Sequence, residues 1–269
     1  MPLAVCATPI GNLEDVTLRV LRELAEADVV LCEDTRHTRG LLERHGIHAR
    51  LLSYHQHNEA TRVEELVPRL EAGERIALVS DAGLPGINDP GARLIEAALE
   101  ARLPVTVLPG PSAVETALVA SGLAGERFLF VGYLPRGEKA LAAIWAELAA
   151  SAHPVVAFES PQRLPATLRS LAAALPERRA AVCRELTKRF EEVVRGTAAE
   201  LVERYAEAPK GEITLVLAGG VAKADEGAAL GAVRELVGAG LSRRQAADVV
   251  ARLLSLSRNT LYRESLQSD

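Results

Sequence analysis

Two glycine- and proline-rich stretches carry polar residues in the pattern of ligand-binding loops. The first, Ala77-Leu-Val-Ser-Asp-Ala-Gly-Leu-Pro-Gly-Ile-Asn-Asp-Pro-Gly91, runs from a short apolar segment into a turn with two aspartates. The second, Val105-Thr-Val-Leu-Pro-Gly-Pro-Ser-Ala113, has the same form. Glycine lets the backbone approach a ligand, proline fixes φ, and the free N–H groups of such loops can hold a polar molecule. We therefore predict that both loops bind a small ligand.

Four further polar clusters also follow apolar segments, and each has a simpler interpretation beside the functional one. They are Ala7-Thr-Pro-Ile-Gly-Asn-Leu-Glu-Asp-Val-Thr17, Leu31-Cys-Glu-Asp-Thr-Arg-His37, Phe158-Glu-Ser-Pro-Gln-Arg163 and Arg184-Glu-Leu-Thr-Lys-Arg-Phe-Glu-Glu192. The first could be an ordinary strand-to-helix connection. In the second, Asp34 or Thr35 could cap a helix and Arg36 could pair with Glu33, or the loop could face a substrate. In the last, residues 189–192 have the charge pattern of a solvated face.

Several common sites are excluded by the pattern of residues. Tyr54-His-Gln-His-Asn-Glu59 has two histidines but no third ligand at useful spacing, so no metal site is predicted. The chain has no G-x-G-x-x-G after its first apolar segment, no Walker A lysine, no H-E-x-x-H and no G-x-S-x-G. A dinucleotide-binding Rossmann domain and a P-loop NTPase are therefore not expected.

Short apolar segments alternate with helical patterns, which predicts an α/β fold with a parallel sheet. The strands expected in the first half are 3–7, 29–32, 76–79 and 105–108, with helices near 18–27, 61–72, 92–101 and 113–123. A second, less purely parallel set has strands 155–158, 180–183 and 213–217 and helices 140–150, 164–174 and 198–205. We predict two α/β domains with a cleft between them, 1–127 and 128–222, and a helical tail, 223–269. Parallel strands place the polar loops at one edge of the sheet, where open α/β folds bind ligands.

Composition indicates an ordinary globular protein with no global attraction to nucleic acid. The 269 residues are 48% hydrophobic and 25% charged, with a formal charge of −5. Any nucleic-acid binding must therefore use a local basic face. Cys6, Cys32 and Cys183 are far apart and in apolar surroundings, typical of buried thiols in a reducing compartment. No signal peptide and no membrane-spanning run is found, so a cytoplasmic protein is expected.

The tail supplies such a local basic face. Between Leu241 and Arg263 it holds five arginines against one acidic residue, Asp248. Residues 242–251 followed by 257–262 resemble a helix-turn-helix, with Ser257 or Asn259 starting the second helix. A plain helical hairpin packed on the body is the alternative. If the tail binds RNA, Arg243 and Arg244 are the expected contacts, through phosphates and shape rather than base reading.

The motifs together resemble one family. The chain carries, in order, T-P-I-G-N-L-x-D, E-D-T-R, S-D-A-G-x-P, D-P-G, P-G-P-S-A, E-S-P and R-E-L-T-K. In this it resembles the tetrapyrrole methylase superfamily, and within it the branch that methylates ribosomal RNA. The resemblance extends from about residue 4 to residue 217 and is weaker in the tail. One departure is Gln162, where family members often carry histidine, which argues against proton transfer at that position.

The resemblance implies S-adenosylmethionine bound between two α/β domains, a homodimer, and 2'-O-methylation of a cytidine ribose in the decoding region of 16S rRNA in the assembled small ribosomal subunit. Carried over by position, the cofactor contacts are Pro9, Ser80, Asp81, Leu84, Ser112, Ala113, Phe158 and Glu185. No metal is implied.

The chemistry adds candidates of its own. Methyl transfer to a ribose hydroxyl is an in-line displacement that needs orientation, with help from a carboxylate or from a cation near the developing alkoxide. Glu159, Glu185 and Lys188 are the candidates for that help, and Asp34 and Arg36 for positioning the substrate. Two alternatives stay open: a methyltransferase acting on a porphyrin or corrin precursor, and a non-catalytic ribosome-binding factor.

Overall fold

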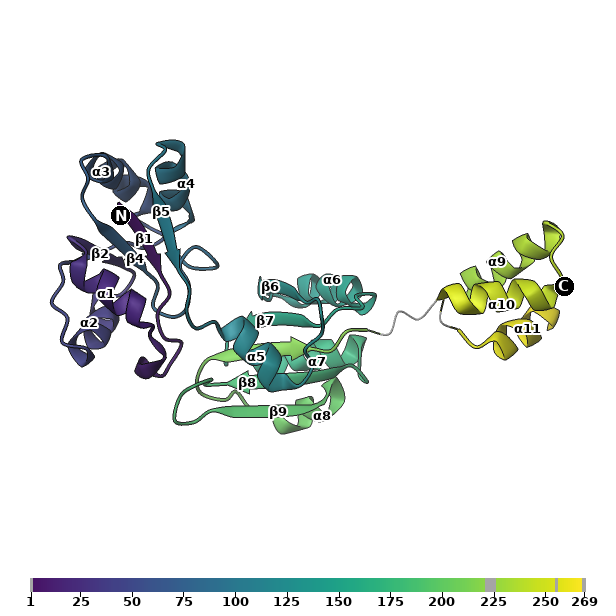
Figure 1. Ribbon diagram of the computed structural model, residues 1–269. Coiled ribbons are helices and arrows are strands. Elements are labelled where there is room, and N and C mark those ends of the chain that lie inside the picture. Colours follow the sequence, from purple (N-terminus) through teal and green to yellow (C-terminus); the bar gives the residue numbers. More distant parts are fainter. Residues whose placement is uncertain (1, 221–225, 255, 268–269) are drawn as a thin grey trace. The chain divides into compact units, whose positions relative to one another are not determined.

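The computed structural model describes residues 2–220, 226–254 and 256–267. Contacts divide the chain into two compact units, Met1–Trp145 with His153–Gly219 and Ala146–Ala152 with Gly220–Asp269. The first unit holds two five-stranded sheets, and the second holds three helices of the tail (Figure 1). The boundary expected between residues 222 and 223 lies outside the described residues. The division into three domains stays a prediction.

The first sheet is entirely parallel, as the alternating pattern predicted. Its strands are β1 (Leu3–Cys6), β2 (Val29–Cys32), β3 (Leu51–Ser53), β4 (Ile76–Val79) and β5 (Val105–Leu108). They lie in the order β3-β2-β4-β1-β5, and every neighbouring pair is parallel. From β1 the chain moves to one side of the sheet, and from β4 it moves to the other. The topological switch point, where such sheets bind ligands, therefore lies between β1 and β4.

Helices cover both faces of this sheet, which is why its three central strands, β1, β2 and β4, are apolar throughout. They are α1 (Leu18–Glu26), α2 (Thr35–Arg44), α3 (Glu59–Glu71) and α4 (Ala92–Glu100), with a short 3-10 helix, η1 (Leu13–Asp15). Leu3 and Val5 of β1 pack in a core with side chains of α3 and α4. Ala4 and Cys6 point the other way and pack with α1 and α2. The alternation along one strand thus builds two cores, one on each face.

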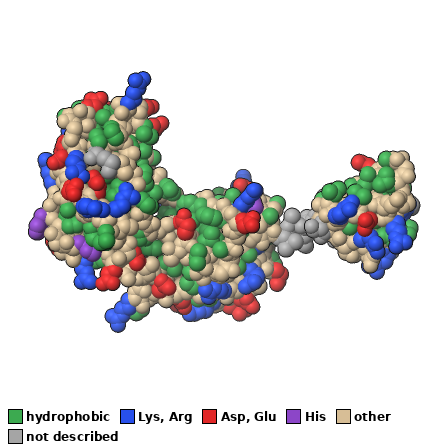
Figure 2. All heavy atoms as spheres, viewed as in Figure 1, with side chains coloured by type: hydrophobic (Ala, Val, Ile, Leu, Met, Phe, Trp, Pro, Cys, Tyr) green, Lys and Arg blue, Asp and Glu red, His purple; other side chains and the backbone are tan. Residues whose placement is uncertain are grey.

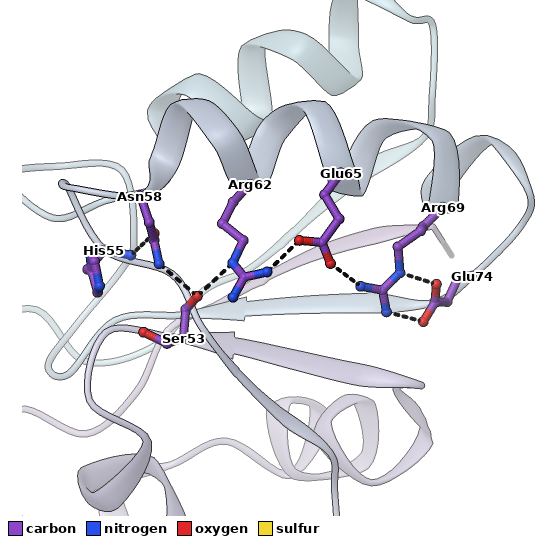
Figure 3. A network of polar contacts seen from close by, with 7 residues as sticks. All are labelled: Ser53, His55, Asn58, Arg62, Glu65, Arg69 and Glu74. Carbon is purple, nitrogen blue, oxygen red and sulfur yellow. Dashed lines mark hydrogen bonds and ion pairs between the residues drawn. The ribbon is translucent and has the colours of Figure 1, made fainter.

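A polar network fixes the segment between β3 and α3 (Figure 3). The carbonyl of Ser53 accepts hydrogen bonds from Nδ2 of Asn58 at 3.1 Å and from Nε of Arg62 at 3.3 Å. From Arg62 the network continues along α3 through Glu65 to Arg69. Each such exposed pair contributes only about 0.3–0.5 kcal/mol. Its effect is to hold the loop that follows β3 at the carboxyl edge of the sheet.

The second sheet is mixed, in agreement with the expected loss of parallel character. Its strands are β6 (Leu129–Tyr133), β7 (Val155–Glu159), β8 (Arg179–Arg184), β9 (Glu192–Thr197) and β10 (Ile213–Leu217). The order is β6-β7-β10-β8-β9, and only β6 and β7 are parallel. The helices of this part are α5 (Ala113–Ser121), α6 (Glu138–Ala149), α7 (Leu164–Ala174) and α8 (Ala198–Arg204). Although α5 follows the last strand of the first sheet, its Ala117 and Leu118 pack in the core of the second sheet.

Strand β9 was not expected, because residues 189–192 were assigned to a solvated face. Arg189, Phe190 and Glu191 are exposed, but Glu192 begins the strand. Its carboxylate pairs with Arg184 at 3.1 Å and Arg204 at 2.9 Å. β9 lies at the edge of the sheet, where a charged residue such as Glu192 can be accommodated within the strand.

The tail consists of α9 (Glu226–Gly238), α10 (Arg243–Leu254) and α11 (Arg258–Gln267). These helices share a core of their own, which includes Val233, Val250 and Leu261. Ser242 starts α10 with a reciprocal cap, because its N–H donates to Oε1 of Gln245 and its Oγ accepts from the N–H of Gln245. Ser257 is the residue before α11, and its Oγ accepts from the Thr260 N–H at 3.4 Å. Of the two residues predicted as alternatives for the start of this helix, Ser257 and Asn259, the structure has Ser257 in that position.

Cys6, Cys32 and Cys183 are free and buried, as the sequence predicted. Burial raises the pKa of the Cys6 and Cys183 thiols to about 12, so both are protonated at neutral pH. Within the described ranges, no helix is long and apolar enough to cross a membrane.

Candidate functional site

The two loops at the switch point are joined to each other. The N–H of Thr8, after β1, donates to the carbonyl of Gly83 at 2.8 Å, and the Gly83 N–H donates back to Thr8 at 3.1 Å. Oγ1 of Thr8 also donates to the carbonyl of Ser80 at 2.9 Å. Gly83 has φ +80°, a conformation that glycine adopts at little cost. The loop that carries Pro9 and the loop that carries Ser80 and Asp81 are therefore held together by hydrogen bonds.

The third loop meets the first one closely. A Cβ on Gly110 would lie 2.9 Å from Cβ of Ala7, so only glycine fits there without a shift. Ser112 is the N-cap position of α5, as expected, but its side chain makes no capping bond. Ala113 packs partly into the core of the second sheet, and Leu84 packs partly into the first. Leu84 belongs to the loop after β4, and Ser112 and Ala113 stand at the start of α5.

The E-D-T-R loop also reaches this edge. The N–H of Asp34 donates to Oδ1 of Asp81 at 3.2 Å, which links the loops after β2 and β4. Asp34 caps α2 by accepting the Arg36 N–H at 2.8 Å. The guanidinium of Arg36 pairs with the same carboxylate at 2.7 Å, not with Glu33 as the alternative interpretation supposed. The hydrogen bonds from Arg36 hold the pKa of Asp34 well below its usual range.

These loops surround a small pocket beside Asp81. It is lined by Thr8, Pro9, Leu13, His37, Thr38, Leu41, Ser80 and Asp81. The hydroxyl of Ser80 is turned inward and donates to Gly83 at 3.1 Å. Among the described residues, Oδ2 of Asp81 has no hydrogen-bond or ion-pair partner. Asp81 therefore offers a free carboxylate oxygen to a ligand that carries a donor.

The R-E-L-T-K loop of the second sheet contacts the first loop of the first sheet. The N–H of Asn12 donates to Oγ1 of Thr187 at 3.0 Å. A Cβ on Gly11 would lie 2.5 Å from Cγ of Lys188 and 2.9 Å from the carbonyl of Leu186. Glu185 and Thr187 have φ of 51° and 65°. Such a conformation costs of order 1–3 kcal/mol in a non-glycine residue and is often found at functional sites.

Within this loop, Glu185 and Lys188 form a tight charged group with Glu212. Nζ of Lys188 lies 3.1 Å from Oε1 of Glu185 and 3.0 Å from Oε2 of Glu212. The Glu212 N–H donates to Oε1 of Glu185 at 2.9 Å, and a Cβ on Gly211 would lie 2.3 Å from Cγ of Glu185. The Glu212 N–H first, and then Lys188, lower the pKa of Glu185. Burial alone would lower the pKa of Lys188, but its two carboxylate partners outweigh burial and raise that pKa.

Glu159 lies in a different environment from Glu185. Its side chain is 0% exposed and pairs with Nη2 of Arg163 at 2.5 Å. Oγ1 of Thr167 donates to its Oε2 at 2.5 Å, and the Ser160 N–H donates to its Oε1 at 2.6 Å. Arg163 also donates to the carbonyl of Leu134 at 3.1 Å. This is the geometry of a buried carboxylate that ties β7 to α7 and to the end of β6.

Phe158 belongs to an aromatic cluster. Its ring lies 5.1 Å from that of Phe130 and 5.5 Å from that of Tyr133, measured between centroids. A Cβ on the neighbouring Gly132 would lie 2.8 Å from Oδ1 of Asn88. The loop after β4 therefore also touches the strand that carries this cluster.

Asp89 of the D-P-G stretch is partly buried and has acidic neighbours. Burial, and then the charges of Glu33 and Asp81, raise its pKa to about 6. An unfolded aspartate has a pKa near 3.9. Since the folded protein holds the proton more tightly, ionisation of Asp89 lowers the free energy of unfolding as the pH rises from about 4 to about 6.

Asp89→Asn is therefore expected to gain stability relative to the wild type over that pH range. After allowance for solvent screening, the gain at neutral pH is expected to be about 1 kcal/mol. Urea unfolding of both proteins at about pH 4 and about pH 7 measures it. Equal differences at the two pH values would contradict this account of Asp89.

The histidine pair after β3 has no third metal-ligating side chain grouped with it in the described part of the chain. The rings of His55 and His57 lie 5.9 Å apart, edge to face. Nowhere in residues 2–220, 226–254 and 256–267 do three or more His, Cys, Asp or Glu side chains group as metal ligands.

The predicted residues thus fall into separate groups. Pro9, Ser80 and Asp81 line one pocket, and Asp34 is bonded to Asp81. Glu185 and Lys188 lie in the loop that contacts Gly11 and Asn12. Gly11, Thr187 and Asp89 were not singled out from the sequence. Gly11 stands in a quoted motif, and its close contact is visible only in three dimensions. Arg243 and Arg244 lie at the start of α10, in the second unit.

Comparison with known proteins agrees with the fold. The family model for tetrapyrrole (corrin/porphyrin) methylases matches residues 2–202. A solved structure of uroporphyrin III C-methyltransferase from Thermus thermophilus, in complex with S-adenosylhomocysteine, is 19% identical with a TM-score of 0.56 and covers 80% of this chain and 96% of that one.

Two curated relatives are much closer in sequence. The "Ribosomal RNA small subunit methyltransferase I" of Mesorhizobium japonicum is 43% identical over 98% of this chain and 91% of its own length. The protein of the same name from Micromonospora olivasterospora is 45% identical over 97% of this chain and 85% of its own length. The resemblance read from the loop motifs is therefore confirmed, and the chain belongs to the tetrapyrrole methylase family.

Proposed function

We propose that this protein transfers a methyl group from S-adenosylmethionine to the 2'-hydroxyl of a cytidine ribose in the decoding region of 16S rRNA, within the assembled small ribosomal subunit. The observation that carries the proposal is the high identity, over nearly the whole chain, with relatives named as small-subunit rRNA methyltransferases. The bonded loops at the switch point supply a place for the cofactor.

The residues at the switch point fit this cofactor. Its amine and ribose hydroxyls are donors, and Oδ2 of Asp81 is a carboxylate oxygen with no partner in the described part of the chain. Pro9 and Ser80 line the same pocket, and Leu84, Ser112 and Ala113 are proposed as further contacts from the adjoining loops. Phe158 and Glu185 are proposed as contacts from the second sheet. When bound, the cofactor supplies a methyl group on a sulfonium centre.

Lys188 is the best candidate for promoting the reaction of the hydroxyl. Glu185 and Glu212 raise the pKa of Lys188, so its ammonium group stays protonated at neutral pH. A cation at this position can stabilise a developing alkoxide. Glu185 has a lowered pKa, which makes it a weak base, and it instead fixes the ammonium of Lys188. Glu159 was the third candidate, but its oxygens are enclosed by Ser160, Arg163 and Thr167. Asp34 and Arg36 remain proposed as groups that position the RNA.

Asp81→Ala is expected to weaken S-adenosylmethionine binding at least about tenfold, because a hydrogen bond to a charged group is lost. Asp81→Asn keeps an acceptor for the Asp34 N–H, so it separates the loss of charge from the loss of that loop contact. Isothermal titration calorimetry measures both, with Asp248→Ala in the tail as the control. Wild-type affinity in Asp81→Ala would remove this residue from the cofactor site.

The proposed reaction is tested with tritiated S-adenosylmethionine and two substrates. Small ribosomal subunits that lack the methyl mark are expected to accept label at a cytidine ribose, and uroporphyrinogen is expected to accept none. Label on uroporphyrinogen alone would assign the chain to porphyrin methylation. Cofactor binding without methyl transfer to any subunit preparation would overturn the proposed reaction. If the protein did not bind the cofactor, the alternative function as a non-catalytic ribosome-binding factor would remain.

We further propose that the protein acts as a cytoplasmic homodimer. Val107 on the edge strand β5 is 50% exposed, and Leu129 and Tyr133 on the edge strand β6 are 40% and 61% exposed. Exposed apolar side chains on sheet edges are typical of surfaces that pair with another chain. The three free cysteines suit a reducing compartment. Sedimentation velocity tests the dimer.

A further inference from the structure

The tail presents arginines and a tyrosine on adjoining surfaces of α10 and α11. On α10, Arg244 and Arg252 are exposed, two helical turns apart, with Asp248 between them on the same side. On α11, Arg258 and Tyr262 are four residues apart, and Nη1 of Arg258 lies 3.9 Å from Oδ1 of Asp248. The two helix surfaces are therefore neighbours. We call Arg244, Arg252, Arg258, Tyr262 and Arg263 the arginine–tyrosine face.

Helix geometry places Tyr262 between two of these arginines. At about 100° per residue, Tyr262 lies about 40° and Arg263 about 140° around α11 from Arg258. Tyr262 is 40% exposed, so its ring is open to a partner. Leu261 and Ser265 lie about 100° and 60° around α11 from Tyr262, on the side away from Arg263, and both are buried. The exposed side of α11 thus carries an aromatic ring flanked by guanidinium groups.

The face is strongly positive for a chain whose net charge is −5. The acidic residues of α10 and α11 are Asp248 and Glu264, and Glu264 lies about 160° around the helix from Tyr262. Among the described residues, Arg244, Arg252 and Arg263 have no carboxylate partner. Lys and Arg side chains gather on one side of this helical unit (Figure 2).

Arg243 differs from Arg244, although the two stand side by side in the sequence. Nη1 of Arg243 donates to the carbonyl of Ser265, which joins α10 to α11. Arg243 is half-buried and Arg244 is exposed. Of the two arginines expected to contact RNA, Arg244 lies on the arginine–tyrosine face, and Arg243 holds the two helices together.

We propose that the arginine–tyrosine face binds single-stranded or loop RNA, with an unpaired base stacked on Tyr262 and phosphates held by the arginines. The inference rests on the proposed function, because an RNA substrate gives the face its occupant. Positive charge complements the phosphate backbone, and bases free of pairing stack on aromatic rings and guanidinium planes. An acidic protein would use the charges but would have no need of the ring.

The test uses the full chain and a short fluorescent RNA hairpin whose loop holds unpaired cytidines. Tyr262→Leu is expected to weaken binding roughly 5- to 100-fold, the effect of losing one base–aromatic stack. Tyr262→Phe keeps the ring and is expected to stay within about twofold of the wild type. Leu253→Ala, an exposed apolar residue of α10, is the matched control and should bind normally. A fully paired RNA should not distinguish Tyr262→Leu from the wild type, because its bases are stacked inside the helix.

The arginines have their own measurement. Arg244→Gln and Arg252→Gln should each reduce the slope of log affinity against log salt by about 0.7, the value for one phosphate contact on single-stranded nucleic acid. Arg234→Gln, on α9, is the control with the same loss of charge outside the face. Circular dichroism and S-adenosylmethionine titration of every variant separate a loss of RNA binding from a loss of folding.

Each outcome decides the proposal. Equal binding of the hairpin by Tyr262→Leu and Tyr262→Phe would overturn base stacking, and unchanged salt slopes for both arginine variants would overturn the phosphate contacts. Equal loss of affinity in Arg234→Gln would show that only net charge matters and would also overturn the face. Hairpin binding is measured without methyl transfer. If the wild type binds the hairpin through Tyr262 but methylates no subunit, the proposed RNA-binding face therefore stands and the proposed methyl transfer is wrong.

Discussion

Gly11→Ala is expected to lower kcat/KM for methyl transfer about a hundredfold or more while the protein stays folded. The added Cβ would lie 2.5 Å from Cγ of Lys188, 2.7 Å from Oγ1 of Thr187 and 2.9 Å from the carbonyl of Leu186. The two side chains can turn aside, but the carbonyl can move only with its loop. The loop that carries Lys188 would then be displaced from the loop that carries Pro9. A misplacement of about 1 Å at a reacting centre can cost about a hundredfold in rate.

Stability should change far less than the rate in this variant. Overpacking by one methyl group costs typically about 1–3 kcal/mol. Gly40→Ala is the matched control, because a Cβ at that position of α2 has nothing within 4 Å. Alanine in place of glycine within a helix should stabilise the protein by about 0.5–1 kcal/mol and leave the rate unchanged. A Gly11→Ala protein with normal kcat/KM would show that the contact between the two loops is not needed for catalysis.

The sequence predicted the central part of the fold because local pattern and tertiary context agree there. Strands β1, β2, β4 and β5 are short apolar runs that end in polar or turn-forming residues; the first three are buried on both faces, and the edge strand β5 is partly buried. Once such strands are parallel, their following loops must meet at one edge. For that reason the joining of the loops that carry Pro9 and Asp81 could be anticipated without coordinates.

Strands β3, β6 and β9 were not predicted, and for β3 and β9 the physical reason is clear. β3 has only three residues, Leu51–Ser53, which are too few to show an alternating pattern of apolar and polar residues. Its extended conformation is set by pairing with β2. β9 begins at a glutamate within a charged run, and its pairing with β8 decides its conformation. In both, the hydrogen bonds of a neighbouring strand outweigh a weak local preference.

The details of the site were less predictable than the loops. Nothing in Arg184-Glu-Leu-Thr-Lys188 indicates that Glu185 and Thr187 have positive φ, because neither residue type favours it. The conformation depends on partners far along the chain, Asn12 for Thr187 and Glu212 for Glu185. Likewise, Glu159 and Glu185 are similar in sequence context, yet one is enclosed by α7 and the other lies in a loop. Only the packing distinguishes the two carboxylates.

Glu159→Ala is expected to lower the free energy of unfolding by about 3 kcal/mol, the effect of removing one partner of a buried ion pair. The carboxylate is fully enclosed, and its loss would leave Arg163 and the Thr167 hydroxyl without their acceptor. Arg163 is 27% exposed and keeps its bond to the Leu134 carbonyl, which limits the loss. Glu159→Gln keeps the size and one acceptor, so about half of the effect is expected to remain. Urea unfolding measures all three proteins.

The same variants decide whether Glu159 has a chemical role. If it serves only to tie β7 to α7, Glu159→Gln should keep kcat within about tenfold of the wild type at a temperature where it is folded, since no transition-state contact is lost. Lys188→Met, at the proposed reacting centre, should lose much more in kcat and little in stability, because Lys188 is partly exposed. A Glu159→Gln protein that is as stable as the wild type but inactive would reverse these roles. The buried carboxylate would then have to reach the substrate after a movement of α7, and Lys188 would be left to position Glu185.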